Sequence, residues 1–139
     1  MTYAELKEYR TLKSDELFYS IEVNRLKLLL DEKVTYYSSP SLDGMPTGGT
    51  QSPTERIAIS KLEYGAEIQK QIAENKAKRD NCRARLQAID DFIENITDSE
   101  AKSLMKRNIK QNVSFRQLAR ERFVSRAYVS RKIFSVCEK

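Results

Sequence analysis

The chain has 139 residues, 32% of them charged and 40% hydrophobic, a balance that favours a folded globular protein over a disordered one. It has no Trp, four Gly and three Pro, and helix-favouring residues predominate, so an all-α fold is expected. Residues 98–139 carry eleven Lys and Arg against four Asp and Glu, whereas residues 1–97 carry fourteen against sixteen. One end of the chain is therefore positive, as is typical of proteins that bind nucleic acids.

Several classes of protein are disfavoured by composition. The two cysteines, Cys82 and Cys137, are far apart in the sequence and there is no histidine, so we expect neither a disulfide framework nor a metal site. No stretch resembles a signal peptide or is apolar for long enough to cross a bilayer. We therefore expect a cytoplasmic protein without membrane contact, and no cofactor.

The first predicted element is a helix from about Tyr3 to Lys33. Its predicted apolar stripe comprises Leu6, Tyr9, Leu12, Leu17, Ile21 and Leu28. The step from Leu12 to Leu17 is out of phase with the rest. Because Ser14 and Asp15 can cap backbone amides, this step predicts either a second helix or a bend.

Residues 38–53 hold three of the four glycines and all three prolines, which predicts a loop or linker. Ser52-Pro53-Thr54-Glu55 then has the capping-box pattern of a helix start. Apolar residues follow at helical spacing: Ile57, Tyr64, Ile68, Ile72, Cys82, Leu86, Ile89, Ile93 and Ile96. A polar stretch at 74–81 leaves three interpretations open: a kink, the end of a partner helix, or a break into two helices.

A long central helix cannot bury its apolar stripe alone. The simplest arrangement folds the N-terminal helix back along it as an antiparallel, coiled-coil-like hairpin, and the alternative pairs it with a second subunit. The stripe from Ile57 to Ile96 is longer than the N-terminal helix can cover. We therefore predict a homodimer held by residues 1–97, with residues 98–139 as a separate domain.

Residues 98–139 predict three short helices. Thr97-Asp98-Ser99-Glu100 and Ser114-Phe115-Arg116-Gln117 repeat the capping-box pattern, and Asn112 ends the first helix. Ser125 is placed to cap a last helix from Arg126 to about Val136.

The last two of these helices match a helix-turn-helix, in which a small residue and apolar wedges hold two crossing helices together. Ala119 is the small residue, and the predicted core comprises Leu104, Ile109, Leu118, Val124, Val129 and Ile133. Arg122 stands where an apolar residue is usual, and Phe123 where Gly is most frequent. Because a positive φ is costly for Phe, we expect a slightly different turn with Phe123 in the core and Arg122 pointing outward.

The outer face of the last helix supplies the candidates for contacts with double-stranded DNA. The base-reading candidates are Ser125, Arg126, Ala127, Ser130 and Arg131. The phosphate-binding candidates are Lys110, Arg116, Arg120 and Lys132. No enzymatic activity is expected, because a nucleophilic Tyr128 would need a histidine-containing site and the chain has no histidine.

Three segments carry a family resemblance: Leu6-Lys-Glu-Tyr9, Ser39-Pro-Ser-Leu-Asp-Gly-Met-Pro46, and Leu118-Ala-Arg-Glu-Arg-Phe-Val-Ser-Arg-Ala-Tyr-Val-Ser-Arg131. The chain resembles the small phage-encoded transcription regulators of Gram-positive bacteria, the ArpU-like and RinA-like late-gene activators, whose C-terminal domain is similar to sigma-70 region four. The resemblance implies an activator in the bacterial host cytoplasm, with host RNA polymerase as a candidate partner. It also implies a DNA-reading role for Ser125, Arg126, Ser130 and Arg131.

Two alternatives stay open. A small terminase-like DNA-packaging protein also joins a helix-turn-helix to helical segments, although such proteins usually place the DNA reader first. A helical protein–protein adaptor or anti-repressor would bind no DNA.

Overall fold

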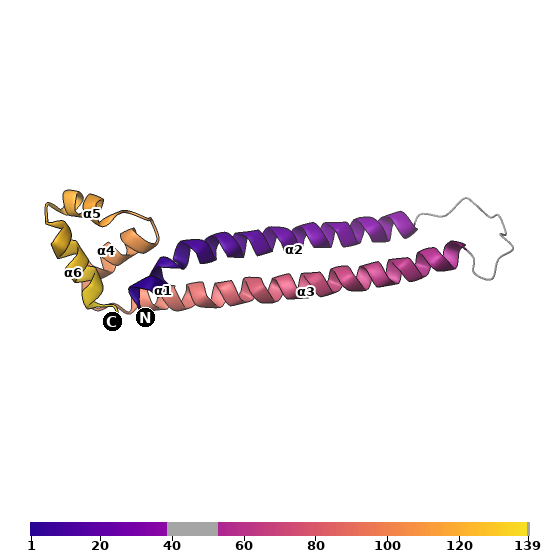
Figure 1. Cartoon of the computed structure of the whole chain (residues 1–139), viewed down its shortest axis with the longest axis horizontal. Helices are drawn as coiled ribbons and strands as arrows, with labels where there is room; N and C mark the ends of the chain where they lie inside the picture. The colour runs from indigo at the N-terminus through magenta and orange to yellow at the C-terminus, as the bar shows by residue number, and fades with distance from the viewer. Residues whose placement is uncertain (39–52, 139) are drawn as a thin grey trace. The chain divides into compact units, whose positions relative to one another are not determined.

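The computed structural model describes residues 1–38 and 53–138, with side chains at residues 1–32 and 62–138. These described residues form six helices: α1 (Tyr3–Lys7), α2 (Tyr9–Ser38), α3 (Pro53–Glu94), α4 (Ser99–Ile109), α5 (Phe115–Arg122) and α6 (Arg126–Ser135) (Figure 1). The all-α class is thereby confirmed. Almost all of the predicted loop at 38–53 lies outside the described residues, as do Ser52 and the side chains of Glu55 and Ile57. No helix among the described residues is long and apolar enough to span a membrane.

The N-terminal helix is interrupted at Glu8, not at Ser14-Asp15. Thr2 and Glu5 form a capping box that starts α1, the chain turns at Glu8, and α2 then runs without a break past Asp15. The predicted second helix start or bend at Ser14-Asp15 is therefore wrong. Local capping residues could not decide this, because a serine or aspartate within a helix can equally leave its side chain in solvent.

The apolar stripe predicted for residues 3–33, which fall in α1 and α2, is right in its first half and wrong in its second. Leu6, Tyr9 and Leu12 are buried. Leu17, Ile21 and Leu28 are exposed, and Val23 and Leu26 are buried in their place. Both sets follow helical spacing, so only packing against a partner helix distinguishes them.

Helix α3 is continuous from Pro53 to Glu94, so the polar stretch at 74–81 does not break it. Within that stretch Asn75 bonds its own helix, donating from Nδ2 to the Gln71 carbonyl oxygen at 2.9 Å. Six of the predicted stripe residues are buried: Ile68, Ile72, Cys82, Leu86, Ile89 and Ile93. Tyr64 is exposed, contrary to the prediction.

The chain divides into two compact units. We call Leu17–Arg79 the arm, and Met1–Glu16 together with Asp80–Lys139 the terminal unit. The predicted division placed residues 1–97 together, whereas here residues 1–16 and 80–97 group with the C-terminal helices. Within the arm, α2 and α3 run antiparallel, with Val23 and Leu26 packed against Ile68 and Ile72 (Figure 1).

In the terminal unit, Glu8 and the start of α2 lie beside the C-terminal part of α3. Arg83 Nε donates to Glu16 Oε1 at 2.8 Å, and the Arg85 guanidinium pairs with the Glu8 carboxylate. Such exposed ion pairs add little stability each. They show, however, which residues of the two helices are neighbours in this unit.

Helices α4, α5 and α6 pack against one another in the terminal unit. Their buried core comprises Ala101, Leu104, Met105, Ile109, Leu118, Ala119, Val129 and Ile133. This confirms the predicted wedge residues apart from Val124, which is only half-buried. Full burial of a Leu, Ile or Val side chain contributes about 1.5–3 kcal/mol, so these residues account for much of the stability of the three helices.

The three helix starts are capped by side chains. Ser114 Oγ accepts from the Gln117 amide at 3.2 Å and Ser125 Oγ from the Tyr128 amide at 3.1 Å, both as predicted. The cap of α4 is Asp98 and not Thr97, because Asp98 Oδ1 accepts from the amide of Glu100 at 3.0 Å. A carboxylate at this position also interacts favourably with the helix dipole.

The turn between α5 and α6 differs from the prediction at Phe123. This residue ends α5 in the left-handed conformation, with φ 56° and ψ 38°, and its side chain is 96% exposed. The Val124 amide donates to the Ala119 carbonyl oxygen at 3.0 Å, the hydrogen bond of a Schellman ending, which requires a left-handed residue. The hydrogen-bonding needs of the helix end therefore outweigh the steric cost for Phe, and the predicted burial of Phe123 is wrong.

Candidate nucleic-acid interface

Helix α6 has one buried side and one that faces solvent. Val129 and Ile133 are fully buried. On a flank of this buried side, Tyr128 Oη donates to Glu100 Oε2 at 2.9 Å, a hydrogen bond that raises the pKa of Tyr128. The hydroxyl of Tyr128 therefore anchors α6 to the start of α4.

The base-reading candidates lie mostly on the solvent side. Arg126, Ala127 and Arg131 are exposed, whereas Ser130 is half-buried. The exposed Ser125 already uses its hydroxyl oxygen as the cap of α6. The structure therefore leaves two long cationic side chains, Arg126 and Arg131, able to reach beyond the helix surface.

Two of the four phosphate-binding candidates are paired with carboxylates within the chain. Lys110 Nζ lies 2.7 Å from Asp90 Oδ1, and this hydrogen bond raises the pKa of Lys110. Lys132 Nζ lies 3.0 Å from Asp98 Oδ2, which raises the pKa of Lys132. These partners offset much of the positive field of the two lysines. No local pattern indicated the first pair, because Asp90 belongs to the preceding helix, α3.

Arg116 and Arg120, the other two phosphate-binding candidates, are exposed on α5. A third arginine nearby, Arg122, was expected to point outward, and it does so while its Nη2 donates to Ser103 Oγ at 2.6 Å. Together with Arg126 and Arg131 they form a set of five exposed guanidinium groups on α5 and α6, none of which has a carboxylate partner among the described residues. We call this set the arginine face, a name for the five residues together, since helical spacing places Arg122 on a different side of α5 from Arg116 and Arg120.

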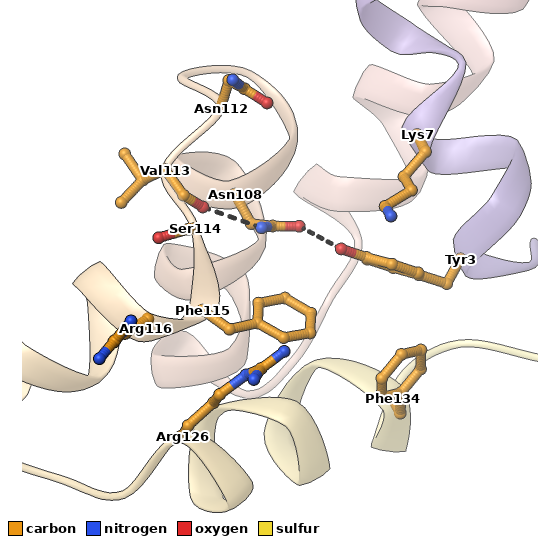
Figure 2. A pocket seen from close by; sticks show the side chains of 10 residues that line it. All are labelled: Tyr3, Lys7, Asn108, Asn112, Val113, Ser114, Phe115, Arg116, Arg126 and Phe134. Atoms are coloured by element: carbon orange, nitrogen blue, oxygen red, sulfur yellow. Dashed lines mark hydrogen bonds between the residues drawn. The ribbon is translucent and has the colours of Figure 1, made fainter.

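A pocket of about 650 Å³ lies in the terminal unit, between α1, the loop from α4 to α5, and α6 (Figure 2). Its lining comprises Tyr3, Lys7, Asn108, Asn112, Val113, Ser114, Phe115, Arg116, Arg126 and Phe134. The lining therefore has three basic side chains and no acidic one. Sequence reasoning missed Tyr3, Lys7, Asn108 and Phe134, since nothing local indicated that α1 would lie beside residues a hundred positions later.

A chain of hydrogen bonds fixes one wall of this pocket (Figure 2). Tyr3 Oη donates to Asn108 Oδ1 at 2.8 Å, and Asn108 Nδ2 donates to the Val113 carbonyl oxygen at 2.9 Å. Burial raises the pKa of Tyr3, so the hydroxyl stays protonated as a donor. The loop that leads into α5 is thereby tied to α1.

Three aromatic rings form the floor of the same region. The ring centroid of Tyr3 lies 4.9 Å from that of Phe134 and 5.8 Å from that of Phe115. Their tilted and edge-on geometry is the arrangement that aromatic quadrupoles favour. Helix α1 is therefore held to α5 and α6 by ring packing and to α4 by the Tyr3–Asn108 hydrogen bond.

The electrostatics of the pocket suit an anion. Lys7 and Arg126 extend their cationic groups toward the pocket, with the Arg126 guanidinium near the Phe115 ring, while Arg116 extends away from it (Figure 2). The capped amino end of α5 at Ser114 adds the positive end of a helix dipole. A phosphate group could accept hydrogen bonds from these donors at the edge of the arginine face.

The structure also bears on the residues considered for other chemistry. Cys82 is free and buried, and Cys137 is free and half-buried. Burial raises the pKa of the Cys137 thiol, which makes it less reactive at neutral pH. Among the described residues, no three His, Cys, Asp or Glu side chains gather as a metal site would require.

Comparison of the chain with known protein families, curated proteins and solved structures finds no match. Its function is therefore inferred from the placement of its own residues.

Proposed function

We propose that the chain is a sequence-specific protein that binds double-stranded DNA and regulates transcription. In this proposal α5, the turn at Phe123 and α6 form a helix-turn-helix similar to sigma-70 region four, and α2 with α3 forms a helical hairpin that precedes it. The observation that carries the proposal is the arginine face. Five guanidinium groups, without carboxylate partners in the described part of the chain, lie on the two helices that a helix-turn-helix would present to DNA.

The distribution of paired and unpaired cations supports this interpretation over a merely basic surface. Lys110, Lys132 and Arg107 each pair with a carboxylate of the same chain, so positive charge is neutralised where it stabilises the fold. The five guanidinium groups of the arginine face have no carboxylate partner in the described part of the chain and can bind an anionic ligand. A polyanion gains most from such a surface, because it releases its counterions on binding.

The proposal assigns different roles to different arginines. Arg131 lies on the side of α6 opposite Val129 and Ile133, where a guanidinium can bond the O6 and N7 atoms of guanine. Arg126, whose guanidinium extends toward the pocket, would instead bind a backbone phosphate (Figure 2). Arg116 and Arg120 lie on α5, which would cross the sugar–phosphate backbone. The pocket beside Lys7 would receive a backbone phosphate next to the groove that α6 enters.

The resemblance to phage late-gene activators supplies the biological context of the proposal. It would make the chain an activator that acts with host RNA polymerase on phage promoters.

The test is DNA binding by the full chain. Duplexes selected from a random library should bind more tightly than random duplex, with affinity that falls as salt rises. Arg131→Ala should cost about 1–3 kcal/mol on the selected duplex and less on random duplex, whereas Arg126→Ala should weaken binding to both duplexes alike. Fluorescence anisotropy at several salt concentrations measures both quantities.

Two controls make the test specific. Lys70→Ala removes an exposed charge from the arm and should leave affinity unchanged. Lys132→Ala removes a charge that Asp98 already offsets, so it should weaken binding less than Arg131→Ala. Failure of the full chain to bind duplex DNA even at low salt would contradict the proposal and favour a protein–protein adaptor.

A further inference from the structure

Helix α2 uses only one of its faces to pack within the arm. Val23 is fully buried and Leu26 is 2% exposed, and both pack against Ile68 and Ile72 of α3. Leu30, one turn further along, lies 3.9 Å from the position that a Cβ would take at Gly65. This apolar face of α2 is therefore covered by α3 of the same chain.

The opposite face of α2 is apolar and exposed. Leu17, Ile21 and Leu28 are 61%, 58% and 69% exposed, and Phe18 beside them is 61% exposed. At 3.6 residues per turn, Leu17, Ile21 and Leu28 fall on one line, about half a turn away from Val23 and Leu26. Their spacing of four and seven residues is that of a coiled-coil seam. We call Leu17, Phe18, Ile21 and Leu28 the outer stripe.

Such a surface is unusual on a protein that remains alone in water. Monomeric soluble proteins scatter exposed apolar residues singly, and contiguous patches mark interaction sites. The predicted dimer surface, the α3 stripe with Ile68 and Ile72, is not available for this purpose because those residues are buried against α2. Leu62 and Tyr64, exposed on α3, lie two residues apart and therefore point in different directions.

We propose that the outer stripe is a homodimer interface, against which a second copy of the chain lays the same stripe in a parallel, in-register coiled coil. The proposal does not depend on DNA binding. Two features next to the stripe, one polar and one charged, select this occupant and this direction.

The polar feature is Asn24, which is exposed and lies on the seam between Ile21 and Leu28. In a parallel, in-register pair, Asn24 faces Asn24 of the second copy, and the two amides can hydrogen bond to each other. In the antiparallel register that sets Leu17 against Leu28, Asn24 would instead face Ile21 and leave its amide unsatisfied. A polar residue in an apolar seam is a known device for fixing register. The next seam position is Asp31, which would face Asp31 of the second copy, so the apolar part of the interface ends at Leu28.

The charged feature is the pair Lys27 and Glu32, both exposed and placed on opposite flanks of the seam. In a parallel coiled coil, a residue on one flank meets the residue five positions later on the other helix. Lys27 of each copy therefore meets Glu32 of the other, which gives two symmetric ion pairs. An unrelated apolar partner would not be expected to carry charges that pair with both Lys27 and Glu32.

The first experiment measures the mass of the DNA-free full chain by sedimentation equilibrium. The wild type should be a dimer at micromolar concentration, and Ile21→Glu/Leu28→Glu should raise the dissociation constant by about a hundredfold or more. Gln69→Glu adds a charge at an exposed position of α3 and should leave the dimer intact. Circular dichroism should show unchanged helix content in both variants, because the substituted side chains are exposed in the monomer. A monomeric wild type at tens of micromolar, or a dimer indifferent to Ile21→Glu/Leu28→Glu, would overturn the proposal.

The second experiment tests the partner and its direction. Lys27→Glu should weaken the dimer roughly tenfold, because the introduced carboxylate would face Glu32 of the second copy at two symmetric places. Lys27→Glu/Glu32→Lys should restore wild-type affinity. No recovery in the double variant would contradict the parallel register. Asn24→Cys adds a direct readout, because the two introduced thiols should form an intermolecular disulfide under mild oxidation. A stable dimer that forms no such disulfide would also contradict in-register packing.

Discussion

The terminal unit and the arm expose opposite kinds of side chain. In the terminal unit, Leu104, Leu118 and Ile133 are buried and the exposed surface of α5 and α6 is rich in arginine. In the arm, a small core around Val23 and Ile68 leaves the outer stripe in solvent. A charged surface matches a polyanion, whereas an apolar one matches another protein. We therefore propose that the two units recognise different partners.

The largest expected effect comes from the core of the terminal unit. Leu118→Ala removes a fully buried side chain and should lower the free energy of unfolding by about 3 kcal/mol. Leu28→Ala, in the outer stripe, should change the stability of the dilute monomer by less than about 0.5 kcal/mol. Urea denaturation of both variants measures the two free energies of unfolding. Similar losses would show that Leu28 is packed as closely as Leu118 and that the outer stripe is not exposed.

A smaller effect tests whether α1 belongs to the terminal unit. Tyr3→Ala removes the hydrogen bond to Asn108 and the ring contacts with Phe115 and Phe134, and should cost about 2 kcal/mol. Tyr3→Phe keeps the ring and should cost only about 1 kcal/mol. Thermal denaturation of the two variants compares them, and a neutral Tyr3→Ala would mean that α1 does not support the C-terminal helices.

The turn between α5 and α6 should gain stability on substitution. Phe123→Gly relieves a left-handed Phe whose side chain makes almost no contacts, and we expect about 1 kcal/mol of stabilisation. Phe123→Ala is the matched control, because it removes the ring but keeps the backbone strain, and it should be close to neutral. Thermal melts of both variants test this, and destabilisation by Phe123→Gly would mean that the exposed ring makes contacts that the structure does not show.

The smallest effect concerns acid stability. Hydrogen bonds from Lys106 and Lys102 lower the pKa of Glu94 from 4.5 to about 2. Because the folded pKa is the lower one, the contribution of Glu94 is fully present above pH 4.5 and is lost as the pH falls toward 2. Since Glu94 is exposed, the contribution is small. Urea midpoints of wild type and Glu94→Gln should differ at pH 7 and converge near pH 2, and a gap that persists at pH 2 would exclude this cause.

Much of the C-terminal fold could be predicted because its signals are local. A serine cap needs only the amides that follow it, so Ser114 and Ser125 were identified from the sequence. The core positions followed from helical spacing and from the small residue Ala119. The candidate site was harder. Nothing in the sequence indicated that Lys110 and Lys132 are paired. The fold brings Asp90 to Lys110 and Asp98 to Lys132, and these carboxylates reduce the ability of the two lysines to bind phosphate.

The sequence by itself determined which end of the chain is positive, the approximate extent of most helices, and that Ser114 and Ser125 cap the last two, because these depend on composition and on neighbours within one or two turns. Only the tertiary structure decided which apolar stripe of α2 is buried, since Leu17, Ile21 and Leu28 follow helical spacing as well as Val23 and Leu26 do. It also decided that Phe123 takes a left-handed conformation in solvent, because the ending of α5 requires that geometry before α6 can pack back on α4 and α5. Long-range packing decides which of two apolar stripes is buried when helical periodicity alone does not distinguish them.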